Sequence, residues 1–210
     1  MVTDFNKIID SIYIKLQQKL PGNVAQERMA PTIRNFNNFK QDNLPKQSAV
    51  MLLLYPKNNE LHIAYFKRPE YDGPHSGQIA FPGGKAEKQD QSLQETALRE
   101  TMEEFGINRQ IIRVLGTLTK LFIPISNMEV TPYIGFIESN PIFSPQKEEV
   151  LYIIETPIKN IIDTTLKTIK TRHRHNVEID TPMYIFENEE IWGATAMITS
   201  EFEDILGEIL

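Results

Sequence analysis

The sequence predicts a single α/β or α+β domain. Apolar runs of strand length and helix-length segments follow one another without strict βαβ alternation, which is typical of these two classes. A length of 210 residues suits one domain with a substantial core. We divide the chain into residues 1–47, an N-terminal helix and irregular connection that we expect to pack on the domain, and residues 48–210, the main domain.

The N-terminal helix is predicted by an apolar stripe. Residues 4–20 place Ile8, Ile12, Leu16 and Leu20 four positions apart, and Pro21 follows. We expect this stripe to pack on the domain or across a homodimer.

The remaining elements follow from the same patterns. Helices are expected at residues 91–105, 157–162 and 194–210, the first of them ending at a glycine. Strands are expected at residues 49–55, 61–66, 111–115, 130–137, 150–154, 184–186 and 190–192.

Composition excludes several classes of protein. The net charge of −6 argues against a broad basic surface for binding nucleic acid, so we expect no nucleic-acid partner. Without cysteine, the chain has no disulfide, thiolate zinc site or cysteine nucleophile. The longest apolar run, residues 49–55, is too short to cross a membrane, and the N-terminus lacks a signal-peptide core. We therefore expect a cytoplasmic protein without a membrane partner.

A carboxylate cluster is the main candidate for chemistry. At 100° per residue, Glu100, Glu103 and Glu104 fall on one side of the predicted helix, roughly opposite a stripe of Leu98, Met102 and Phe105. The three carboxylates repel one another unless a hard divalent cation such as Mg²⁺ binds them. An ordinary amphipathic surface helix shows the same spacing, so the spacing alone does not establish a site.

The segment before this helix supports the hypothesis that the glutamates form a functional site. Phe81-Pro82-Gly83-Gly84 is a tight turn with an exposed backbone, as loops that handle phosphate often have. Arg99 lies four residues after Glu95, so the sequence suggests an ordering salt bridge between them.

The segment resembles the Nudix box. The matching residues are Gly84, Arg99-Glu100, Glu103-Glu104, Gly106 and Ile107. The spacer is one residue longer than usual, Asp90 is the candidate for the acidic position, and Thr101 stands at an aliphatic position. The resemblance implies an α/β/α sandwich with a mixed sheet. It also implies Mg²⁺- or Mn²⁺-dependent hydrolysis of a diphosphate linkage. The expected metal ligands are Glu100, Glu103 and Glu104, and the expected catalytic residues are these three glutamates and Arg99.

A narrower resemblance, to the coenzyme A pyrophosphatase branch, covers residues from about 48 to the C-terminus. It is carried by three segments, 68–84, 123–127 and 191–196. The resemblance implies coenzyme A or an acyl-CoA as the small-molecule substrate, cut to 3′,5′-ADP and a phosphopantetheine product. Arg68, His75, Gly83 and Gly84 are then the expected substrate-binding residues.

One departure affects the expected substrate contacts. Gly73 stands where the branch has a second arginine, so another cation is needed for a 3′-phosphate, and the run Arg172–His175 is the candidate. Glu148 and Glu149 are candidates for a further ligand or general base. Trp192 is expected to pack in the core or anchor a hairpin rather than to stack on an adenine.

Three alternatives stay open. The first is a Nudix hydrolase acting on NADH, ADP-ribose or a nucleoside triphosphate. The second is a non-catalytic nucleotide-binding module, which we would expect to have lost box glutamates. The third is an interaction domain without chemistry.

Overall fold

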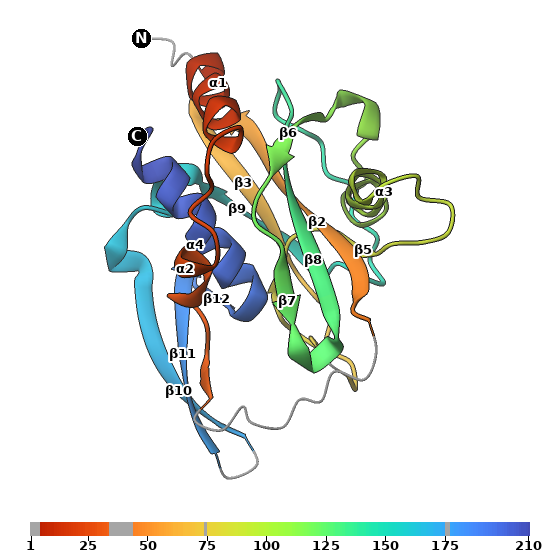
Figure 1. Ribbon diagram of the computed structural model, residues 1–210. Coiled ribbons are helices and arrows are strands. Elements are labelled where there is room, and N and C mark those ends of the chain that lie inside the picture. Colours follow the sequence, from red (N-terminus) through yellow and green to blue (C-terminus); the bar gives the residue numbers. More distant parts are fainter. Residues whose placement is uncertain (1–4, 34–43, 74, 175–176) are drawn as a thin grey trace.

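The computed structural model describes residues 5–33, 44–73, 75–174 and 177–210. In this part of the chain a large mixed sheet lies between helix α3 on one side and helices α1 and α4 on the other, as Figure 1 shows. The helices are α1 (Phe5–Leu16), α2 (Asn23–Glu27), α3 (Leu93–Phe105) and α4 (Gly193–Gly207). Short 3₁₀ turns occupy Arg109–Ile111, Pro124–Ser126, Ile158–Asn160 and Thr164–Leu166.

The larger sheet has eight strands within the described residues. Its main path is β4-β3-β2-β8-β6, while β5, β7 and β9 pair with β2, β8 and β3. The pair β2–β8 is parallel and the others are antiparallel. The strands are β2 (Lys46–Lys57), β3 (Glu60–Lys67), β4 (Ile79–Ala80), β5 (Gly83–Lys85), β6 (Arg113–Thr117), β7 (Leu121–Ile123), β8 (Met128–Phe136) and β9 (Tyr152–Pro157).

Strand β2 explains the continuous apolar run in the sequence, because it is covered on both faces. Met51 and Leu53 belong to the cluster under α3, whereas Leu52 and Leu54 belong to the cluster shared with α1 and α4. The predicted α/β/α sandwich with a mixed sheet is confirmed.

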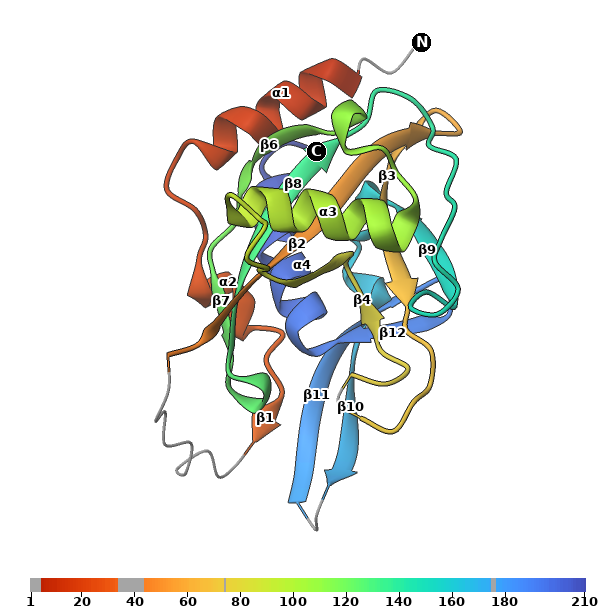
Figure 2. The same ribbon diagram turned by 90° about the vertical axis from the view of Figure 1, so that its right-hand side faces the viewer.

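A smaller antiparallel sheet lies beside the sandwich. It consists of β1 (Thr32–Ile33), β10 (Lys167–Arg174), β11 (Val177–Phe186) and β12 (Glu189–Trp192). Its β10 and β11 extend away from the body of the molecule (Figure 2). The sequence patterns did not reveal β10, since its strand is mostly polar and its Ile169 is 67% exposed. Backbone pairing with β11, rather than an apolar face, holds β10 in place.

Several predicted boundaries were wrong for local reasons. Helix α1 ends at Leu16 rather than residue 20, because the next two amides bond three residues back to Ile14 and Lys15. The predicted helix over residues 157–162 is only a 3₁₀ turn. The irregular connection predicted to residue 47 contains α2 and β1, and its residues 34–43 lie outside the described residues.

The N-terminal segment is fixed to the sandwich by one buried carboxylate. Glu201 of α4 is fully buried and accepts hydrogen bonds from the Gly22 N–H (3.1 Å), Gln26 Nε2 (2.9 Å) and the Thr119 N–H (3.2 Å). A buried carboxylate that is satisfied in this way ties three chain segments together. The apolar stripe of α1 packs against its own chain, since Ile12 is buried in the chain's core.

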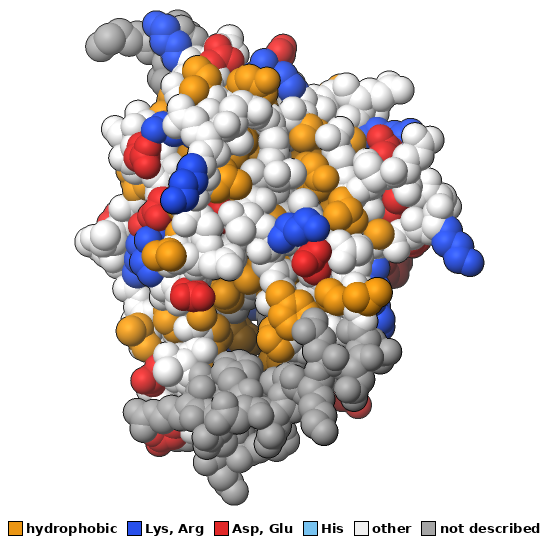
Figure 3. Space-filling model, viewed as in Figure 1, with side chains coloured by type: hydrophobic (Ala, Val, Ile, Leu, Met, Phe, Trp, Pro, Cys, Tyr) orange, Lys and Arg blue, Asp and Glu red, His pale blue; other side chains and the backbone are white. Residues whose placement is uncertain are grey.

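The described surface is mixed in character. On the face seen in Figure 3, basic and acidic side chains are interspersed among apolar ones. None of the described helices combines the length and apolar composition that a membrane crossing requires.

Candidate active site

Helix α3 begins and ends where its sequence supplies caps. Ser92 Oγ accepts a hydrogen bond from the Glu95 N–H (3.2 Å), as in a capping box. At the other end Gly106 takes a left-handed conformation with φ 70°, and its N–H bonds to the Met102 carbonyl. These caps fix the length of the helix and the positions of its glutamates.

The buried face of α3 differs from the predicted stripe. Leu98 and Phe105 are buried as expected, but Met102 is 43% exposed. Ala97, Thr101 and Glu104 complete the buried face instead. The small side chains at 97 and 101 let the helix lie close to the sheet, and this places a glutamate against the loop before the helix.

Glu104 is held in that buried position by the glycine loop. Its Oε2 accepts a hydrogen bond from the Gly83 N–H at 2.8 Å, and Arg68 Nη2 lies 3.7 Å from its Oε1. Burial raises the pKa of Glu104 to about 8, and repulsion from Glu100 and Glu149 adds to the rise, while Arg68 opposes it. The structure therefore places a desolvated carboxylate at the centre of the cluster.

Glycines allow the loop to approach so closely. A Cβ on Gly84 would lie 2.2 Å from Glu100 Oε1, and a Cβ on Gly83 would lie 2.3 Å from the Ala49 carbonyl oxygen. A side chain at position 83 would therefore displace the backbone of β2, and one at position 84 would displace the Glu100 carboxylate. The loop, strand β2 and two box glutamates thus meet at one point.

Arg99 organises the more exposed carboxylates. Its Nη1 lies 2.9 Å from both Glu100 Oε1 and Glu103 Oε2, and its Nη2 donates to the Lys85 carbonyl at 3.2 Å. Burial raises the pKa of Glu100, whereas Arg99 opposes that rise. Arg99 is thus a positioning residue in this arrangement.

Asp90, the candidate for the acidic position of the box, anchors Arg99. Its two oxygens accept from Arg99 Nε and Nη2, each at 3.0 Å, and Thr96 Oγ1 donates to it at 2.8 Å. The guanidinium holds the pKa of the Asp90 carboxyl well below its usual range. The suggested pairing of Arg99 with Glu95 is wrong, because Glu95 bonds to Arg109 at 2.9 Å.

The loop between β3 and β4 carries the other two candidates. Arg68 stacks on Phe66, with its guanidinium carbon 4.9 Å from the ring centroid, and turns toward the glutamate cluster. His75 has a left-handed backbone with φ 67°, and its Nδ1 is 3.0 Å from Gln78 Oε1. Arg68 is therefore part of the cluster, whereas the contact given for His75 is within its own loop.

The structure distinguishes the two candidate glutamates, Glu148 and Glu149. The charge of Glu149 is among the main causes that raise the pKa of both Glu100 and Glu104, whereas that of Glu148 is not. The segment that carries Glu149 touches the end of α3, where the Gln146 N–H bonds to the Glu104 carbonyl at 3.4 Å. A pair of adjacent glutamates offered no signal in the sequence to choose between them.

The basic run lies on the smaller sheet. Arg172 donates to Glu190 Oε2 at 2.8 Å and stacks on Trp192, with its guanidinium carbon 4.3 Å from the ring centroid. Trp192 is half-buried at the end of β12. The side chains of His173 and Arg174, and the whole of His175, lie outside the described residues.

The donor set suits a divalent metal. Among the described side chains, no three carboxylate or imidazole groups are already arranged to hold a metal ion. Arg68 contacts Glu104, and Arg99 contacts both Glu100 and Glu103. However, carboxylate oxygens are the ligands that Mg²⁺ and Mn²⁺ prefer. Glu104 is buried with its counter-charge 3.7 Å away, so a closer cation would stabilise it.

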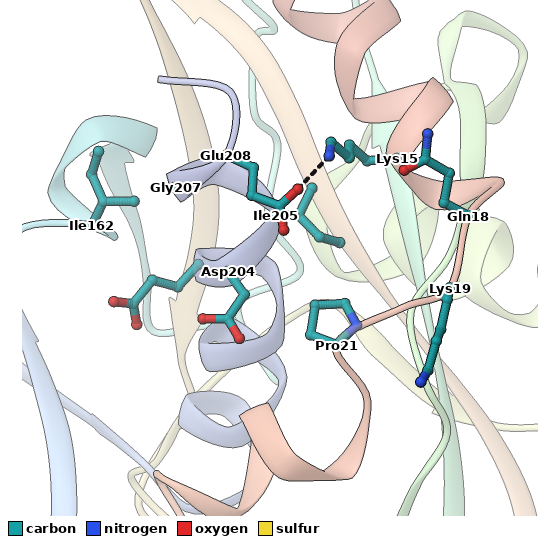
Figure 4. A pocket seen from close by; sticks show the side chains of 10 residues that line it. Lys15, Gln18, Lys19, Pro21, Ile162, Asp204, Ile205, Gly207 and Glu208 are labelled. Atoms are coloured by element: carbon teal, nitrogen blue, oxygen red, sulfur yellow. Dashed lines mark hydrogen bonds and ion pairs between the residues drawn. The ribbon is translucent and has the colours of Figure 1, made fainter.

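A cavity of about 620 Å³ lies elsewhere, between α1 and the end of α4 (Figure 4). Several of its charged groups are paired with neighbours: Lys15 with Glu208, Asp204 with Arg28 and Glu203 with Lys167. It contains no residue of the glutamate cluster. The cluster is accordingly the stronger candidate for chemistry.

Comparison with known proteins agrees with the resemblance of helix α3 and its loop to the Nudix box. The model of the NUDIX domain matches residues 45–156, which is more than half of the chain. An uncharacterised Nudix hydrolase, NudL of Yersinia pestis, is 38% identical over 132 residues, 63% of this chain and 66% of that protein. NudL of Yersinia pseudotuberculosis matches to the same extent.

Solved structures support the fold. The Nudix hydrolase RenU of M. smegmatis aligns with a TM-score of 0.55 at 13% identity, over 79% of this chain and 88% of that one. The MutT protein of Methanosarcina mazei aligns with a TM-score of 0.52 at 16% identity, over 80% of this chain and 99% of that one.

The close approach at Gly84 is testable. We expect Gly84→Ala to lower the free energy of unfolding by about 1–3 kcal/mol, the usual cost of overpacking. The reason is that the new Cβ overlaps the Glu100 carboxylate, which Arg99 holds in place. Denaturant unfolding measures the change.

Gly73→Ala is the matched control. Its Cβ would lie 3.0 Å from the ring of Tyr71, which is 49% exposed, rather than against a carboxylate of the cluster. We expect a change within about 0.5 kcal/mol, as for ordinary surface substitutions. Equal, small effects at both positions would contradict the assigned role of Gly84.

Proposed function

The chain belongs to the Nudix family, and on that premise we propose that it is a divalent-metal-dependent hydrolase of nucleoside diphosphate linkages. The observation that carries the proposal is the contact between the Gly83 N–H and the buried Glu104 carboxylate, with Glu100 and Arg99 around it. This arrangement gathers acidic oxygen donors beside a glycine loop that a phosphate can approach closely.

Glu100, Glu103 and Glu104 would hold the metal. When bound, Mg²⁺ or Mn²⁺ would neutralise phosphate oxygens and lower the pKa of a bound water. The protein's own contribution is to keep the three carboxylates in place. The Asp90–Arg99 ion pair does this for Glu100 and Glu103, and the Gly83 N–H does it for Glu104.

Glu149 is our candidate for the general base. It belongs to the segment packed against the end of α3, outside the three proposed ligands, and its charge reaches Glu100 and Glu104. A carboxylate there could accept the proton of the attacking water. Glu148 is not among these main contributors and serves as the control.

For the substrate we propose coenzyme A or an acyl-CoA, cleaved to 3′,5′-ADP and a phosphopantetheine product. The support is the spacing of Arg68, Gly77 and Phe81 before the glycine loop, on the segment that reaches Glu104. NADH, ADP-ribose and nucleoside triphosphates are the alternatives within the same chemistry. A non-catalytic nucleotide-binding module is disfavoured by the intact set of box glutamates.

The metal-dependent activity is testable with purified protein and a panel of diphosphates. We expect EDTA to abolish hydrolysis. We also expect Glu103→Gln to lower kcat on the order of 100-fold or more, because metal-borne charge stabilisation is worth several kcal/mol. Chromatography of the products measures both effects.

Two controls separate chemistry from folding. Glu95→Gln changes an exposed glutamate of the same helix and should leave kcat unchanged. Glu149→Gln should lower kcat by about 100-fold or more, the scale of general-base catalysis, whereas Glu148→Gln should not. Full activity in Glu103→Gln would show that the site is assigned wrongly.

The substrate is testable by competition between related compounds. We expect a higher kcat/KM for coenzyme A than for dephospho-coenzyme A, NADH or ADP-ribose. Arg68→Ala should reduce the preference for coenzyme A over its dephospho form by about 10- to 100-fold if Arg68 meets the 3′-phosphate. Higher kcat/KM for NADH or ADP-ribose would reject coenzyme A as the substrate.

A further inference from the structure

We propose that Arg172 and Trp192 form a stacking platform for the base of the nucleotide substrate. This inference rests on the proposed function and names a second part of the same site, on the smaller sheet. The platform would take a planar purine, most directly the adenine of an adenosine diphosphate moiety. It would add recognition of the base to the recognition of phosphate by the glycine loop.

The geometry of Arg172 is that of a flat, prearranged surface. The guanidinium carbon lies 4.3 Å from the Trp192 ring centroid, and Glu190 Oε2 accepts from Nη2 at 2.8 Å. One N–H of the guanidinium is thus engaged by a carboxylate, and its central carbon lies over the indole ring. The side chain remains 33% exposed.

This arrangement favours a base over a phosphate as the ligand. A phosphate bound to the guanidinium would lie beside the Glu190 carboxylate, which already accepts from Nη2 and would repel it. A base needs only the flat face, and nucleobases stack on both aromatic rings and guanidinium planes. Trp192 lies beneath the guanidinium, and the hydrogen bond to Glu190 holds its Nη2.

The platform is tied to the catalytic loop through short contacts. Trp192 ends β12 and lies three residues before Thr195, whose Oγ1 donates to the Ile79 carbonyl at 2.9 Å. Strands β12 and β4 lie next to each other (Figure 2). Ile79 precedes Gly83 by four residues, which span at most about 14 Å when extended.

A second contact fixes the same junction. Lys67, the last residue of β3, bonds to Glu189 of β12 at 2.9 Å, immediately before Arg68 in the chain. The two elements that carry Arg68 and Trp192 are thus held together. A nucleotide with its diphosphate at the glycine loop would therefore have its base on the side of the smaller sheet.

Trp192 makes the proposal directly measurable, because it is the only tryptophan in the sequence. Its fluorescence can be followed in EDTA during titration with ADP or with ribose 5-phosphate, so that no hydrolysis is needed. We expect saturable quenching by ADP and none by ribose 5-phosphate, which lacks a base.

Two substitutions on one strand locate the contact. Arg172→Lys keeps the charge but loses the plane, and should weaken ADP binding roughly tenfold or more, the scale of one base stack. Lys170→Met is the matched control, since Lys170 bonds to the same Glu190 at 2.9 Å but does not stack on Trp192. It should leave the affinity for ADP unchanged.

The outcomes separate the platform from the proposed function. If ADP quenches Trp192 as expected but no diphosphate is hydrolysed, the platform stands and the proposed function fails. If diphosphates are hydrolysed but ADP leaves the fluorescence unchanged, the platform is wrong. Equal weakening by Arg172→Lys and Lys170→Met would also overturn it, because charge rather than stacking would then explain the binding.

Discussion

The hydrogen bond from the Gly83 N–H to the buried Glu104 carboxylate is the contact on which the rest of the site depends. It joins the glycine loop to helix α3 at 2.8 Å, and it requires that residues 83 and 84 carry no side chain. Once this contact forms, the register of α3 against β2 is set. Glu100 and Glu103 then take their positions from the same helix.

Electrostatics explains how so many carboxylates coexist. Like charges on neighbouring turns of a helix destabilise it. Here Arg99 lies between Glu100 and Glu103, and Asp90 holds Arg99 from the other side. Arg68 compensates Glu104 at longer range. The site therefore combines two outer glutamates, Glu100 and Glu103, that Arg99 holds in place with the buried Glu104, whose ionised form Arg68 compensates only in part.

The sequence predicted what depends on periodicity and end signals. The strands β2 and β3 and helix α3 follow from apolar runs bounded by glycine, proline or a cap, whereas the sandwich was expected from the resemblance to the Nudix box. It failed where structure comes from pairing between distant segments, as for the polar strand β10. It also placed Glu104 on the exposed side of α3, because only the tertiary contact with Gly83 explains why a glutamate is buried there.

Binding of Mn²⁺, followed by the electron paramagnetic resonance signal of the free ion, tests the central claim most directly. The wild type should bind at least one Mn²⁺ per chain. Glu104→Gln keeps an acceptor for the Gly83 N–H but loses the charge, and it should bind Mn²⁺ at least about tenfold more weakly, the equivalent of 1.4 kcal/mol. Equal Mn²⁺ affinity in both proteins, with both correctly folded, would contradict the assignment of this carboxylate cluster as the metal site.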